Sequence, residues 1–310
     1  MNSAAEVPLV LANLTTVATG SFRERVEVAR EAGYQGLGIG LDTCRRVTSS
    51  EMPAHAMKSV LDDNGMRIVE LEVILGFAVD PAQAGVPFGG GFSYTSEEDL
   101  AEFLRMAEIF GSTHIQAAGA FTEQLEPDVV ERFAGLCDRA ADSGLNVAIE
   151  FCAPSNIPDA AVAAEILTAA DRPNGGACID IWHHTRGANN LGLLAKIPSD
   201  KVFMVQLNDG GPEPVDPDFF TETLRFRRVP GAGAFDTLGF LQTLDASLDT
   251  ASVSVEVMSE ELGGREPLAA ARATVQAARS VLAHARSAPC GLAAPPVQDT
   301  AAGDRRRQCG

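Results

Sequence analysis

Short apolar segments rich in β-branched residues alternate along this chain with longer segments of helical periodicity. The eight strand candidates are Pro8–Ala12, Gln35–Ile39, Arg67–Val73, His114–Ala118, Asn146–Phe151, Ala177–Asp180, Val202–Leu207 and Val253–Val257. A strand, a helix and a parallel neighbouring strand form the repeating unit of α/β proteins. The order therefore predicts an α/β protein built as a single (β/α)₈ TIM barrel.

An open, doubly wound sheet is the structural alternative. The GxGxxG turn that follows the first strand of dinucleotide-binding sheets is absent here, which favours the barrel. We expect residues 1–285 to form one catalytic barrel domain. Residues 286–310 turn to Ala, Pro, Gly and Ser and are predicted to form a disordered tail.

Helix boundaries are marked by capping residues. Ser21 and Gly33 enclose one helical segment, and Ser96 and Gly111 enclose another. Two strand-to-helix connections, 74–95 and 208–234, are longer than usual. In a barrel such connections lie at the ligand-binding face, so they are candidates for a lid or a substrate wall, with simple padding as the alternative.

Charge indicates which kinds of partner the protein can bind, and cysteine usage indicates its cellular compartment. The net charge of −18 argues against binding to nucleic acid or to an anionic membrane surface. The six cysteines show no CxxC pairing, and no segment has the pattern of a secretory signal or a membrane span. We therefore expect a reduced, cytoplasmic protein.

Four successive strands in the second half each carry one oxygen-bearing side chain at or near the carboxyl end. These residues are Glu150, Asp180, Gln206 and Glu256. One such glutamate alone is more often a salt-bridge partner, but four at one rim of a barrel would repel one another without a cation. Oxygen ligands of this kind suit Mg²⁺ or Mn²⁺. The pattern therefore predicts a divalent metal site.

Several side chains near these strand ends are candidates for substrate contacts. His183 follows Asp180 by three positions and can hydrogen-bond a substrate oxygen, with the adjacent His184 as the competing candidate. Arg227 and Arg228 precede the segment VPGAG in the long seventh connection. A guanidinium there can bind a substrate hydroxyl or carboxylate, or it can neutralise the acidic rim.

Other candidates come from the earlier strands and from aromatic residues. Glu72 and Gln116 can contact substrate hydroxyls, or they can be core polar groups that the backbone satisfies. The aromatic side chains near the site are Trp182, Phe77, Phe88, Phe92, Tyr94, Phe219 and Phe220. They can accommodate a substrate bulkier than a free sugar, or they can simply pack the loops together.

Taken together, these motifs resemble those of the xylose isomerase-like TIM barrels, a group often described as sugar phosphate isomerases and epimerases. The resemblance covers about residues 7 to 285 and depends on the two strand-end glutamates, the Asp-x-x-His motif, the QxxD segment and the R-x-x-PGxG loop. It implies that the four strand-end residues bind the metal and that His183 and Arg227 or Arg228 contact substrate. Glu150 and Glu256 would also be the acid and base on opposite faces of the substrate. Many epimerases and isomerases of the family have histidine where this chain has Gln206.

The implied chemistry is removal of a proton next to a carbonyl, with a metal-stabilised enediolate. Return of the proton elsewhere gives isomerisation or epimerisation of a sugar, keto-sugar or polyol-derived substrate, which we expect first. Loss of a β-substituent from an oxidised sugar, inosose or glycoside, catalysed by a lyase, is the alternative. A non-catalytic partner subunit is a third possibility, and a multi-zinc nuclease needs more histidines than the five present. A homo-oligomer is the commonest assembly for such proteins.

Overall fold

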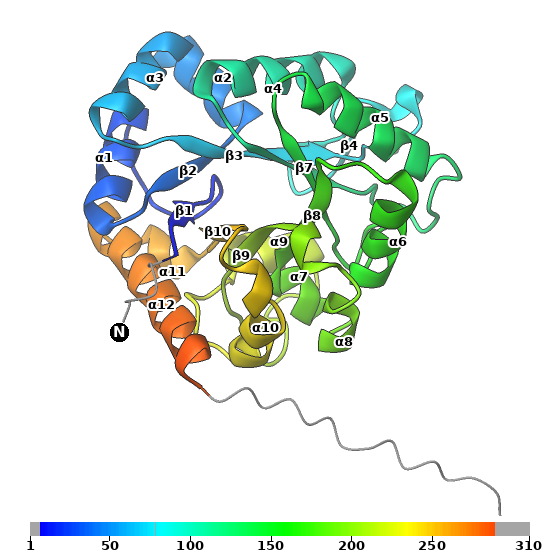
Figure 1. Ribbon diagram of the computed structural model, residues 1–310. Coiled ribbons are helices and arrows are strands. Elements are labelled where there is room, and N and C mark those ends of the chain that lie inside the picture. The colour runs from blue at the N-terminus through cyan, green and yellow to red at the C-terminus, as the bar shows by residue number, and fades with distance from the viewer. Residues whose placement is uncertain (1–6, 78, 289–310) are drawn as a thin grey trace, which may run out of the picture.

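Eight parallel strands close into a barrel in the computed structural model, which describes residues 7–77 and 79–288 (Figure 1). The strands are β1 (Leu9–Leu11), β2 (Gly36–Gly40), β3 (Ile68–Leu75), β6 (His114–Ala118), β7 (Asn146–Glu150), β8 (Gly175–Asp180), β9 (Val202–Leu207) and β10 (Ser252–Val255). Their order around the barrel is β1-β10-β9-β8-β7-β6-β3-β2. Each overlaps one of the predicted strands, so the predicted barrel is confirmed.

Helices surround the barrel (Figure 1). They are α1 (Phe22–Ala32), α2 (Leu41–Ser50), α3 (Ala54–Asp63), α4 (Glu97–Phe110), α5 (Val129–Ala141), α6 (Ala160–Ala170), α7 (Ile181–Arg186), α8 (Leu191–Leu194), α9 (Phe219–Arg225), α10 (Thr237–Thr243), α11 (Glu260–Gly263) and α12 (Pro267–Ser287). Ser21 caps α1 through its side chain, and Gly33 ends that helix at a φ of 105°, as the sequence predicts. Ser96 and Asp99 form a capping box at the start of α4.

The two long connections contain structure of their own. The connection after β3 holds a short antiparallel pair, β4 (Pro87–Gly89) and β5 (Phe92–Ser93). The connection after β9 holds α9. Both connections leave the carboxyl ends of barrel strands, where the active sites of such barrels are built.

The structure can be compared with two further expectations, the C-terminal tail and the absence of a membrane span. Helix α12 reaches Ser287, so Arg286 and Ser287, the first two residues of the expected tail, are helical. The rest of that expected tail, residues 289–310, lies outside the described residues. No helix in the described part of the chain is long and apolar enough to cross a membrane.

A buried carboxyl group lies inside the barrel beneath the rim. The Glu70 side chain on β3 accepts a hydrogen bond of 2.6 Å from the Ser252 hydroxyl on β10. Because β1 and β2 separate β3 from β10 around the sheet, this bond crosses the barrel interior. Burial raises the pKa of Glu70 to about 7, although the hydrogen bond from Ser252 opposes the rise.

We expect Glu70→Gln to change how stability depends on pH. A carboxyl whose pKa is raised in the folded state binds its proton more tightly there, so its unfavourable ionisation lowers the free energy of unfolding as pH rises towards 7. Between pH 5 and pH 8 the variant should gain on the order of 3 kcal/mol relative to wild type. Urea unfolding across this range measures the difference.

The exposed Glu123→Gln provides the matched control, and its difference from wild type should stay near zero at every pH. A constant difference between Glu70→Gln and wild type would mean that Glu70 ionises in the folded protein as it does in the unfolded chain.

Candidate metal and substrate site

The four predicted strand-end residues meet at the carboxyl rim of the barrel. Glu150 ends β7 and Asp180 ends β8. Gln206 on β9 lies beside Asp180 in the strand register, and Ser254 on β10 lies beside Gln206. Glu256 follows two residues after Ser254, just beyond the last strand. The parallel register therefore brings all four side chains to one end of the barrel.

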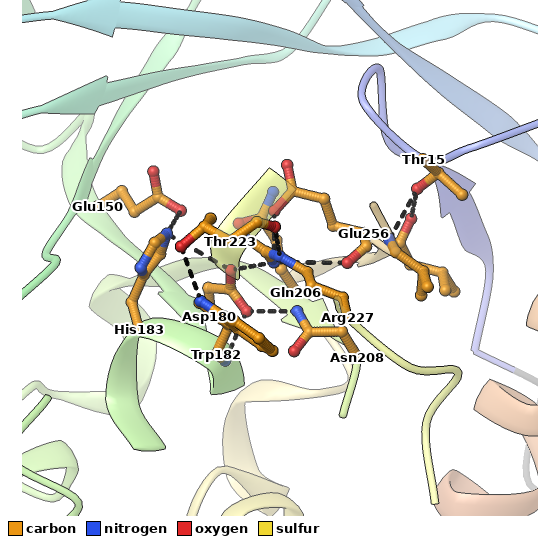
Figure 2. A network of polar contacts seen from close by, with 12 residues as sticks. Thr15, Glu150, Asp180, Trp182, His183, Gln206, Asn208, Thr223, Arg227 and Glu256 are labelled. Carbon is orange, nitrogen blue, oxygen red and sulfur yellow. Dashed lines mark hydrogen bonds and ion pairs between the residues drawn. The ribbon is translucent and has the colours of Figure 1, made fainter. Parts of the chain in front are cut away.

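Arg227 is the cation at the centre of this rim. Its guanidinium is buried and donates to the Asp180 carboxylate at 2.7 Å and to the Glu256 carboxylate at 3.0 Å (Figure 2). Its Nε also donates to the backbone oxygen of Thr223 on α9, at 3.2 Å. Burial lowers the pKa of Arg227, but Asp180 and Glu256 outweigh that effect, so the net shift is upward. Of the two roles expected for this arginine, the structure shows the neutralisation of the acidic rim.

Asp180 is held in place by three donors. One carboxylate oxygen accepts from the backbone N–H of Trp182 at 2.8 Å and from the Asn208 side chain at 2.7 Å. The other oxygen accepts from Arg227. Burial raises the pKa of Asp180, but Arg227, then His183 and these hydrogen bonds, lower it by more than burial raises it. The net shift is downward, so Asp180 stays ionised.

Glu150, Asp180 and His183 form a cluster that can hold a metal ion. One ligand atom from each lies within 4.8 Å of the other two. The His183 Nε2 is 3.6 Å from a Glu150 oxygen and 3.7 Å from an Asp180 oxygen. Burial lowers the pKa of His183 to about 4, which leaves the imidazole neutral, the form that binds metals.

Glu150 differs from Asp180 in accepting no hydrogen bond from Arg227, whose charge acts on it only from a distance. Burial, then Glu256 and Asp180, raise the pKa of Glu150 well above its usual range. A divalent cation at this cluster would offset that repulsion between carboxylates. Two carboxylates and a neutral imidazole are a donor set that fits such a cation.

The other two predicted ligands are arranged differently. Glu256 faces Arg227, and burial raises its pKa to about 7 against the opposing effect of that arginine. The Gln206 amide oxygen accepts a long hydrogen bond of 3.5 Å from Gln116, and its buried amide nitrogen has no partner among the described residues. A buried donor without a partner is costly, so this group is available to a ligand.

A cavity of about 570 Å³ opens at the rim, a size usual for small-molecule sites. Six of the predicted site residues line it: Glu72, Gln116, Glu150, His183, Arg227 and Glu256. Glu72 accepts a hydrogen bond of 2.9 Å from the Asn13 backbone. Burial, then Glu256 and Glu70, raise the pKa of Glu72.

Three other candidates lie apart from the cavity. Trp182 is completely buried, and its indole nitrogen donates to the Thr223 hydroxyl at 3.0 Å. Arg228 is exposed, and its backbone forms an antiparallel bridge with Asp209. His184, the competitor of His183, packs against the Phe240 ring at 5.9 Å. None of the three lines the cavity in the described structure.

Two contributors to the site are missing from the residues predicted from the sequence. Asn208 donates to Asp180, and its place two residues after Gln206 is a signal that strand periodicity offers. Thr223 contacts both Trp182 and Arg227 from α9. No local pattern indicates Thr223, because its role depends on where the long connection folds.

Comparisons with known proteins identify a family and several relatives. The sequence profile of the xylose isomerase-like TIM barrel family matches residues 26–281. A 3-dehydroshikimate dehydratase of Pseudomonas aeruginosa is 31% identical over 126 residues, which are 40% of this chain and 20% of that protein. An inosose isomerase of Bacillus subtilis is 27% identical over 178 residues, which are 53% of this chain and 62% of that protein. The matches thus span less than two thirds of either relative.

Solved structures share the fold at low sequence identity. The structure of IOLI protein with a binding zinc atom has a TM-score of 0.77 at 18% identity and covers 91% of this chain and 100% of that chain. The probable 3-DHS dehydratase AsbF of Bacillus anthracis has a TM-score of 0.65 at 14% identity, covering 87% and 97% of the two chains. A D-allulose 3-epimerase of Methylomonas sp. has a TM-score of 0.64 at 16% identity, covering 89% and 97%. These likenesses show a common architecture that carries different reactions.

We expect Arg227→Met to destabilise the protein strongly. The substitution keeps an apolar stem but leaves the buried carboxylates of Asp180 and Glu256 without their cation, a change that costs about 3–5 kcal/mol. Urea unfolding in the presence of EDTA measures the loss.

The neighbouring Arg228→Met is the control, because Arg228 is exposed, and it should change stability by less than about 0.5 kcal/mol. Equal effects of the two substitutions would contradict the central role of the Arg227 ion pairs.

Proposed function

Because the chain belongs to the xylose isomerase-like TIM barrel family, we propose that it is a divalent-metal-dependent enzyme that removes a proton next to the carbonyl group of a small polyhydroxylated substrate. The observation that carries this proposal is the cluster of Glu150, Asp180 and His183, of which Glu150 and His183 line a cavity that Glu256 and Arg227 also line. Its relatives include a dehydratase and an isomerase, two classes whose reactions can share this first step.

In this proposal Glu150, Asp180 and His183 hold the cation and Gln206 is a further ligand. The family pattern predicts Glu256 as a ligand too, but here Glu256, which is bonded to Arg227, has the role of the acid. The bound cation supplies Lewis acidity that favours negative charge on the substrate carbonyl oxygen. Mn²⁺ and Mg²⁺ are the ions that an oxygen-rich set suits, and the imidazole of His183 also admits Zn²⁺.

Glu150 is the proposed base. Its carboxylate lines the cavity and has no hydrogen bond to an arginine, whereas Asp180 and Glu256 both bind Arg227. A positioned carboxylate that no arginine holds is free to accept a proton from the substrate. Arg227 fixes the carboxylates of Asp180 and Glu256 in place, and of these two Glu256 lines the cavity.

The two glutamates are therefore not equivalent, and this asymmetry leads us to place elimination before isomerisation. Glu150 takes the proton from the carbon next to the carbonyl, the bond from the neighbouring carbon to its hydroxyl breaks, and Glu256 in its protonated form gives its proton to the departing oxygen. Water and an unsaturated carbonyl compound are the products. The presence of Gln206 where many isomerases and epimerases have histidine points the same way.

Isomerisation or epimerisation is the second candidate, because Glu256 also lines the cavity and, with a pKa of about 7, can return a proton to the substrate. The similarity to an inosose isomerase supports it. The remaining alternative is a barrel without catalysis that serves as a partner subunit. The substrate is expected to be a small carbohydrate-like molecule in every case in which the protein is an enzyme.

Deuterium incorporation from D₂O tests the common step. The purified protein, loaded with Mn²⁺ or Mg²⁺, is incubated with an inosose, a keto-sugar, a 3-keto-glycoside and 3-dehydroshikimate. We expect solvent exchange into at least one of them, and EDTA should abolish it. A product lighter by one water molecule identifies elimination, and an unchanged mass apart from deuterium identifies isomerisation. A protein that stays inert with every metal and compound would favour the non-catalytic subunit.

Glu150→Gln should slow exchange by at least about 100-fold, the usual contribution of a positioned base. Glu123→Gln is the control and should exchange at the wild-type rate, because that residue lies outside the cavity. Metal content of both variants, measured by mass spectrometry, separates loss of the base from loss of the ion. Full activity of Glu150→Gln would contradict the assignment of Glu150 as the base.

A further inference from the structure

Aromatic side chains from three strand-to-helix connections gather around the cavity, and the proposed proton transfer does not use them. We call them the aromatic cluster: Phe88, Phe92, Tyr94, Phe121, Phe219 and Phe220, all of which line the cavity. Five of these six residues, all except Phe121, come from the two long segments that the sequence predicts as a lid or wall. Tyr94 is buried, and the other five rings are partly exposed.

The cluster has a defined geometry. The Phe88 ring stacks on Phe121 with 4.7 Å between centroids and 15° between planes, and on Tyr94 with 4.5 Å and 24°. Phe220 on α9 reaches across to Phe121 at 5.3 Å. Through Phe121, which follows β6, these contacts join the connection after β3 to the connection after β9, so the aromatic wall is built from all three connections.

Close backbone packing sets the position of Phe220. A Cβ atom added at Gly89 would lie 2.5 Å from the Phe220 ring, and one added at Gly90 would lie 2.7 Å from it. Both glycines have positive φ, at 154° and 59°, conformations that a side chain rarely adopts. The glycines therefore allow the β4–β5 segment to approach the ring of α9.

The cluster adjoins the proposed metal ligands. The Phe219 ring lies 6.0 Å from the His183 ring. The cavity thus combines hydrogen-bonding groups around Glu150 and Arg227 with an aromatic wall that begins next to His183. A free polyol would satisfy the polar groups and leave the exposed faces of these aromatic rings in contact with water.

The ionisable side chains that line the cavity are mainly acidic, which disfavours an anionic substituent on the substrate. The carboxylate side chains that line it are Asp42, Glu72, Asp99, Glu150 and Glu256. Its two arginines already have acidic partners, since Arg45 binds Asp99 at 2.7 Å and Arg227 binds Glu256 at 3.0 Å. Among the described lining residues each arginine is thus already bonded to a carboxylate, and there is no lysine.

From these observations we infer that the substrate is a neutral polyhydroxylated carbonyl compound that carries an aromatic or similarly flat apolar substituent. The hydroxylated part binds among Glu150, His183 and Arg227, and the substituent packs against the aromatic cluster. This inference rests on the proposed function for the carbonyl group alone. The substituent and the lack of charge follow from the lining of the cavity.

Binding of unreactive glucosides tests the inference separately from turnover. Isothermal titration of the Mn²⁺-loaded protein compares 4-nitrophenyl β-D-glucoside, methyl β-D-glucoside and 4-nitrophenyl β-D-glucuronide. Aromatic contacts add about tenfold in affinity or more, so we expect the aryl glucoside to bind that much more tightly than the methyl glucoside. The glucuronide, which has a carboxylate in place of the 6-hydroxymethyl group, should bind at least about tenfold more weakly than the aryl glucoside.

Phe220→Ala should reduce the ratio of aryl to methyl affinity by about tenfold. Phe220→Leu keeps an apolar side chain and serves as the second variant in case the alanine variant unfolds. It should reduce the ratio of aryl to methyl affinity by less than Phe220→Ala does. The matched control is Phe203→Ala, because Phe203 is a partly buried ring on β9 outside the cavity, next to His114 at 6.3 Å. Phe203→Ala should leave the ratio unchanged.

Equal affinities for the aryl and methyl glucosides would overturn the inference, and so would a ratio unaffected by both Phe220 substitutions. A glucuronide that binds as tightly as the glucoside would overturn the exclusion of anions. Failure of the proposed function has a different signature, namely an aryl preference without EDTA-sensitive deuterium exchange in any carbonyl compound.

Discussion

The buried ion pairs of Arg227 with Asp180 and Glu256 are the interaction on which the rest of the site depends. Several carboxylates at one rim of a barrel repel one another, and burial makes each of them costly to ionise. One guanidinium that bonds two of them within 3.0 Å relieves that cost and ties the connection after β9 to the ends of β8 and β10. The same contacts position α9, whose Thr223 supports both Arg227 and Trp182.

This arrangement makes the acidic residues unequal, and that inequality is the basis of the proposed chemistry. Asp180 is ionised and fixed by three donors, whereas Glu150 lies near the neutral His183 with a raised pKa. A symmetric pair of glutamates would suit transfer of a proton from one face of a substrate to the other. An unpaired base opposite an arginine-bound acid suits removal of a proton coupled to loss of a hydroxyl.

Much of the fold follows directly from the sequence. Each of the eight predicted strands is present, because buried parallel strands are short apolar runs and the helices between them carry their own capping signals. The meeting of Glu150, Asp180, Gln206 and Glu256 at one rim also follows, since all carboxyl ends of a parallel barrel lie on the same side. Their roles as ligands and catalysts, and the substrate, remain proposals.

Other features depend on how side chains from distant segments meet. The sequence by itself left Arg227 and Arg228 as equal candidates and placed Trp182 among the substrate contacts. The tertiary structure buries Arg227 between two carboxylates, leaves Arg228 exposed and encloses Trp182 away from the cavity. The sequence thus determined the barrel and the residues at its rim, because strand periodicity and capping are local. Only the tertiary structure decided which side chain faces which, because the conformation of the long connections depends on packing between residues far apart in the chain.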